Sequence, residues 1–135
     1  EQFKKSFHSS NEIYANHFKR KYDEELPPLW VSVEIMTLGE ISKWFSNLNR
    51  YDQKEISKYY NFPTQSLRTL LINLTEVRNI CAHHSRLWNK KLTKAISIPK
   101  KLNIETPHSF KIYHTLIVMN KVLQNITSKS NLLND

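Results

Sequence analysis

The 135-residue sequence contains very little glycine or cysteine and no long apolar run. One glycine leaves few residues for tight hairpin turns, which argues against a fold built from β-hairpins. The only cysteine, Cys81, excludes an intramolecular disulfide and fits a reducing compartment such as the cytoplasm. The most apolar segment, residues 29–45, includes Glu34, Glu40 and Lys43, so we expect no membrane span. Repeats, heptads and glycine-rich phosphate loops are also absent from the sequence.

Acidic residues are outnumbered as well. Twelve Asp and Glu against 20 Lys and Arg give a formal charge of +8 at pH 7. An excess of positive charge favours polyanionic partners because it raises their local concentration and association rate. Charge alone does not separate an RNA- or DNA-binding protein from one with an ordinary basic surface.

The remaining composition predicts an all-α fold in a single domain over residues 1–135. The chain opens on Glu1 rather than Met, so we expect it to be a C-terminal piece of a longer protein. Residues 90–109 are basic and lack a strong period, so we predict a loop that could also touch RNA. We expect residues 127–135 to be frayed. Hydrophobic periodicity and helix breakers predict helices at residues 11–22, 29–48, 52–61, 64–88 and 109–126.

The longest predicted helix carries the most reactive side chains. A turn of about 100° per residue places Arg78, Asn79 and His83 in one polar sector of about 140°, together with Arg86. His84 falls at the edge of the opposite, apolar sector. The residues of the apolar sector are Leu67, Leu70, Leu71, Leu74, Val77, Cys81 and Trp88.

For the histidine, cysteine and tryptophan of this segment, the sequence allows both a structural and a functional interpretation. His84 fits a core-edge histidine bonded to a carbonyl as well as a catalytic residue. Cys81 fits a small buried side chain, and Trp88 fits the core better than a base-stacking platform. Cys81 and His84 could share a metal, but no second ligand pair has matching spacing, so we expect no metal. The helical wheel does not separate an active patch from a solvent face.

A resemblance to known proteins decides between these interpretations. The segment "RNICAH", residues 78–83, resembles the motif of the HEPN superfamily of helical ribonucleases. Together, "VRNICAHHSRLWN" and the upstream "LPPLWVSVEIMTLGEISKWF" resemble the Abi-like abortive-infection family of bacterial phage-defence proteins. The resemblance covers most of residues 11–125, and that family usually has additional N-terminal sequence.

The resemblance implies a HEPN-like helical bundle and a metal-independent endoribonuclease without cofactors. Arg78 and His83 would be the catalytic pair, Asn79 would orient one of them, and Arg86 and His84 would contact RNA. Cleavage by the 2′-hydroxyl would leave a 2′,3′-cyclic phosphate, and a homodimer would form a composite active site from two motifs. The alternative is a non-catalytic RNA-binding or dimerisation module of a defence system. For Arg86, a structural salt bridge is the other interpretation.

Overall fold

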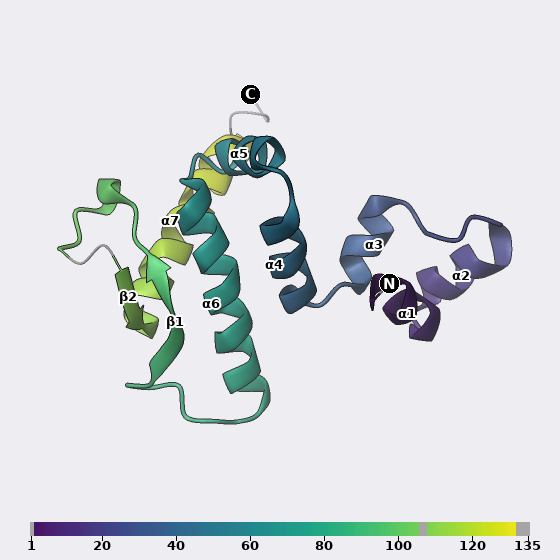
Figure 1. Ribbon diagram of the computed structural model, residues 1–135, viewed down its shortest axis with the longest axis horizontal. Coiled ribbons are helices and arrows are strands. Elements are labelled where there is room, and N and C mark those ends of the chain that lie inside the picture. The colour runs from purple at the N-terminus through teal and green to yellow at the C-terminus, as the bar shows by residue number, and fades with distance from the viewer. Residues whose placement is uncertain (1, 106–107, 132–135) are drawn as a thin grey trace. The chain divides into compact units, whose positions relative to one another are not determined.

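The computed structural model describes residues 2–105 and 108–131. Within these residues the chain forms seven α-helices, one short 3₁₀ helix and two strands (Figure 1). The chain divides into two compact units, Glu1–Ile41 and Ser42–Asp135, and the boundary between them falls inside helix α4 (Leu38–Asn47). The predicted helical character is confirmed, but a two-stranded sheet makes the all-α prediction wrong in one segment.

The N-terminal unit is a small helical cluster. Its core is formed by Phe7, Ala15 and Phe18, with Ile35 packed against them. Lys4 donates a hydrogen bond to the Glu25 carboxylate, and this bond together with the Lys4 charge lowers the pKa of Glu25. The predicted helix at residues 11–22 is confirmed as the second of the three helices that complete this unit, α1 (Gln2–Ser9), α2 (Ile13–Lys21) and α3 (Leu29–Ile35).

The predicted continuous helix at residues 29–48 is wrong, because the structure divides it into α3 and α4. Thr37 accepts a hydrogen bond through Oγ1 from the Glu40 backbone N–H at 3.2 Å, and the Glu40 carboxylate accepts from the Thr37 N–H at 2.8 Å. This reciprocal pair is a capping box, which satisfies two donors at a helix start. The sequence Thr-Leu-Gly-Glu therefore begins a new helix and places Gly39 in its first turn rather than in a helix interior.

The C-terminal unit packs two long helices and a strand around one core. Helix α5 (Arg50–Tyr59) is capped by Asn49, whose side chain accepts a hydrogen bond from the Asp52 N–H. Figure 1 shows α6 (Thr64–Ala82) beside strand β1 (Lys91–Ser97), and α6 also packs against α7 (Ile112–Asn131). The buried apolar residues of this core are Phe45, Phe62, Leu67, Leu70, Ile96, Ile98, Val118 and Val122.

The predicted loop at residues 90–109 is mostly ordered into other elements. Strand β1 pairs antiparallel with β2 (His108–Lys111), and η1 (Lys100–Leu102) lies between them. The register shifts between Lys91 and Ile96, which breaks the regular alternation of the strand. A strand is usually recognised from apolar residues at every second position. Here the irregular register and the basic residues at exposed positions obscure that alternation.

Side chains of α6 hold β1 through its backbone. The Ser97 N–H donates to Thr69 Oγ1 at 3.0 Å, and the Asn73 amide donates to the Lys94 carbonyl at 3.1 Å. Thr93 N–H donates to both carboxylate oxygens of Glu76, at 2.8 and 3.0 Å. The helical donors and acceptors are spaced by four and three residues, so they lie on one face. A two-stranded sheet is marginal alone, and this helix supplies the missing support.

Helix α7 buries only part of the face that its apolar residues predict, since Met119 packs against the core. We expected an apolar face of Phe110, Tyr113, Leu116, Ile117, Met119 and Leu123. Instead Thr115, Val118 and Val122 are buried, whereas Tyr113 and Leu116 are exposed. The Thr115 hydroxyl points inward and donates to the side-chain amide oxygen Oδ1 of the buried Asn73 at 3.2 Å. A buried amide that requires a partner therefore decided the orientation.

The described helices include none with the length and apolar character that crossing a bilayer requires.

Candidate active site at the end of helix α6

The end of α6 is set by backbone hydrogen bonds rather than by its side-chain pattern. The His84 N–H donates to the Cys81 carbonyl, and the Ser85 N–H donates to the Ile80 carbonyl, both at 3.0 Å. This pair of bonds is a Schellman motif, in which the residue after the cap adopts a left-handed conformation. His84 occupies that position with φ 50°. The motif ends the helix at Ala82 and turns the chain towards β1 (Figure 1).

This early end corrects several predictions made from a helix extending to residue 88. Arg86 and Trp88 lie beyond the helix, so neither belongs to a helical stripe. Cys81, His84 and Trp88 are exposed, and the predictions that they are buried or at the core edge are wrong. The helical wheel failed here because its angles apply only while the helix continues. The predicted apolar sector is confirmed farther back, at Leu67 and Leu70.

Asn79 and His83 line one shallow hollow between the end of α6 and the start of β1. Lys90 and Lys94 also line it, as does Glu76, whose carboxylate accepts a hydrogen bond from the Thr93 N–H. Arg78 is exposed and does not line this hollow. The structure therefore brings together two of the three predicted catalytic residues, and the arginine lies on a different side of the helix.

The three polar side chains at this end are available to a ligand. Across residues 2–105 and 108–131, no other side chain or backbone group hydrogen-bonds to the side chain of Arg78, Asn79 or His83. Histidine is the side chain best suited to proton transfer near neutral pH, and two lysines attract an anion. Chemically, this arrangement suits an anionic ligand whose reaction requires a proton to move.

No group of three or more His, Cys, Asp or Glu side chains that could hold a metal ion occurs in the described part of the chain. Cys81 and His84 lie on the Schellman turn, where both are exposed.

Sequence reasoning placed Lys90 and Lys94 in a loop that could touch RNA, but it did not assign them to the site. It also missed a groove lined by Trp88, Phe110 and Tyr113, because these aromatic residues were assigned to the core. The run "WNKK" at residues 88–91, with an aromatic residue followed by two lysines, was the available indication of a surface site.

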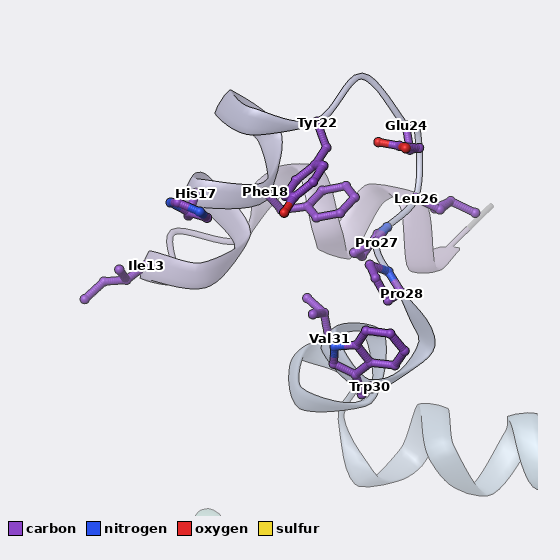
Figure 2. A pocket seen from close by; sticks show the side chains of 10 residues that line it. All are labelled: Ile13, His17, Phe18, Tyr22, Glu24, Leu26, Pro27, Pro28, Trp30 and Val31. Atoms are coloured by element: carbon purple, nitrogen blue, oxygen red, sulfur yellow. The ribbon is translucent and has the colours of Figure 1, made fainter.

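The N-terminal unit contains a separate apolar pocket. Figure 2 shows Trp30 and Val31 on one side and the rings of Phe18 and Tyr22 on the other. Those two rings stack with centroids 5.0 Å apart. Pro27 and the other lining residues belong to α2, α3 and the connection between them, and none is a predicted catalytic residue.

Comparison with known proteins gives one match. No curated protein and no solved structure matches the sequence. A family model described as Abi-like protein matches residues 1–89, which include all of α6 and the turn after it. Membership of this family suggests an abortive-infection context in phage defence. The predicted family is confirmed, and the chain belongs to the Abi-like protein family.

Proposed function

We propose that this protein is a metal-independent endoribonuclease of the HEPN type that acts in phage defence. The observation that carries the proposal is the hollow that Asn79 and His83 line beside Lys90 and Lys94. A histidine without a hydrogen-bond partner in the described chain has no evident structural role. Family membership and the resemblance of residues 78–83 to the HEPN motif add independent support.

The reaction needs no group that the side chains cannot supply. The RNA 2′-hydroxyl attacks its adjacent phosphorus, the bond from phosphorus to the 5′-oxygen breaks, and a 2′,3′-cyclic phosphate and a 5′-hydroxyl form. One group removes the proton from the 2′-hydroxyl, and another gives a proton to the departing oxygen. His83 takes one of these roles, Asn79 orients it, and Arg78 stabilises charge on the phosphate oxygens. His84 and Arg86 contact flanking phosphates.

A homodimer completes this site. Each chain has one motif, and Arg78 lies outside the hollow that contains His83. A second copy related by a two-fold axis would bring its own Arg78 and His83 to the same cleft. That arrangement supplies both the arginine and a second proton-transfer group.

The alternative is a non-catalytic RNA-binding or dimerisation module. The separation of Arg78 from the His83 hollow favours it, because a binding surface needs positive charge without a fixed catalytic geometry. A net charge of +8 suits both functions. Proton transfer distinguishes them, since only the enzyme requires the histidine.

The deciding experiment incubates the chain with mixed RNA in EDTA, beside His83→Ala. We expect the parent to cut and the variant to lose about 10²- to 10⁴-fold in rate, because a general acid or base contributes that much. RNA affinity should change little, since the charges of lysine and arginine dominate phosphate binding. A substrate with a 2′-deoxy sugar at the cut site should bind and survive. Equal cleavage by His83→Ala would overturn the proposal.

A further inference from the structure

A second surface feature of the C-terminal unit lies next to the candidate active site. The turn after α6, strand β2 and the first turn of α7 form a groove of about 720 Å³. Lys90 lines both this groove and the hollow that contains His83. The groove and the hollow are therefore neighbours that share one lysine.

Exposed aromatic rings are the main apolar component of this groove. Trp88 is 82% exposed and Tyr113 is 64% exposed, although both are large enough to stabilise a core. Phe110 is partly exposed beside them, with the Lys91 ammonium 5.1 Å from the centre of its ring. Aromatic rings that are exposed to solvent in this way can stack against a ligand that is itself planar.

The walls of the groove are held in place by the sheet and by hydrogen bonds. Lys91 pairs with Lys111 across the two strands, which fixes Phe110 next to them. The Ser109 hydroxyl lies 2.8 Å from His114 Nδ1 and accepts a hydrogen bond from the Lys111 N–H at 3.1 Å. A preformed surface of this kind loses little conformational entropy when a ligand binds.

The charge of the groove identifies its ligand. Lys90, Lys91 and Lys111 line it, and the described residues of its lining include no Asp or Glu. Lysines interleaved with exposed aromatic rings are what single-stranded nucleic acids require, because phosphates follow the positive charge and unpaired bases stack on the rings. An A-form duplex keeps its bases stacked inside and offers no free base faces.

We propose that this groove binds unpaired nucleotides of single-stranded RNA and leads the strand across Lys90 to the hollow of Asn79 and His83. Bases stack on Trp88 and Tyr113, and the lysines contact the phosphates. The assignment rests on the proposed function for the choice of RNA, and it names the substrate class of that site as single-stranded RNA.

The test measures binding without cleavage. The full chain is titrated into a labelled oligouridylate of about 12 nucleotides, a length within known single-strand site sizes. Its riboses are 2′-O-methylated, so attack by a 2′-hydroxyl is impossible. We expect Trp88→Ala and Tyr113→Ala each to raise Kd by about fivefold to 150-fold, from the usual contribution of one stacked base. Trp88→Phe should recover part of the loss, because it restores a ring.

Matched controls come from α5. Tyr51 is an exposed tyrosine outside the groove, so Tyr51→Ala should leave Kd within about twofold of the parent. Lys91→Ala should lower the slope of log affinity against log salt by about 0.7, the single-strand value for one phosphate contact. Lys54→Ala, also exposed on α5, should leave that slope unchanged.

The proposal fails if Trp88→Ala and Tyr113→Ala bind as Tyr51→Ala does, or if a duplex of the same length binds as tightly. It also fails if the parent is a dimer while Trp88→Ala and Tyr113→Ala are monomers that keep full RNA affinity per chain, since the groove is then a self-association surface. Its failure is separable from that of the proposed function. If the parent binds the oligonucleotide but cuts no RNA, the proposed function fails and the groove proposal stands. If Trp88→Ala cuts RNA with an unchanged KM, the groove proposal fails and the proposed function stands.

Discussion

Two neighbouring stretches, residues 69–76 within α6 and residues 78–84 at and just beyond its end, hold polar side chains in opposite states. Asn73 is fully buried and uses both its donor and its acceptor, towards β1 and α7. Asn79, six residues later on the same helix, is exposed and lines a hollow. The first asparagine fixes the packing of three elements, and the second is free to meet a ligand. Residue type therefore says less about role than the partners that surround it.

The largest effect expected from this comparison is on activity at the exposed stretch. Arg78→Ala should lower cleavage by at least about 10²-fold, because it removes charge stabilisation from the transition state. The free energy of unfolding should hardly change, since Arg78 is exposed. Rates of RNA cleavage and urea unfolding curves measure the two effects. A large loss of stability would place Arg78 with the buried stretch instead.

Mixing variants sharpens this first prediction. If both copies' His83 side chains serve one cleft, the parent mixed with an equal amount of His83→Ala should keep only about a quarter of the activity of undiluted parent, because one dimer in four then holds two intact motifs. The parent diluted with an equal amount of an unrelated protein is the control and should keep half. Half of the activity in the first mixture would argue against a site shared across the dimer.

The next effect is on stability, and it compares the two asparagines directly. Asn73→Ala should lower the free energy of unfolding by about 2–3 kcal/mol, because the Lys94 carbonyl and the Thr115 hydroxyl lose a buried partner. Asn79→Ala should lower it by less than about 0.5 kcal/mol. Urea titrations followed by circular dichroism measure both. Equal losses from the two substitutions would remove the distinction between the stretches.

The smallest effect concerns the left-handed residues that end α5 and α6. Asn61 ends α5 with φ 48° and the same two Schellman bonds that His84 has at the end of α6. Asparagine tolerates this conformation better than histidine does. We therefore expect His84→Gly to raise the free energy of unfolding by about 0.5–1 kcal/mol and Asn61→Gly by less. The midpoints of urea unfolding measure the difference. A lower midpoint for His84→Gly would mean that the imidazole itself stabilises the fold.

The helices were largely predictable because their residues interact locally. Apolar spacing identified the four segments that became α2, α5, α6 and α7, and their ends differ from prediction by a few residues except at α6. The break at Thr37 was readable too, since a capping box depends on residues only three apart. The end of α6 was not, because a histidine in the left-handed position is an uncommon terminator.

The strands were not predictable for a physical reason that Glu76 illustrates. Its carboxylate binds the Thr93 backbone, 17 residues away, and a similar distance separates Asn73 from Lys94. Local pattern contains no information about such partners. The sheet depends on them, because its two strands alone are too few to be stable.

By itself, the sequence determined that the chain is mostly helical, basic and a member of the Abi-like family, and that residues 78–83 carry a motif worth testing. These properties follow from composition, local spacing and the order of residues. Only the tertiary structure decided that His83 and Asn79 share a hollow without Arg78, and that Trp88 faces solvent. Both outcomes depend on where α6 ends and on where β1 returns beside it, which backbone hydrogen bonds and long-range side-chain contacts determine.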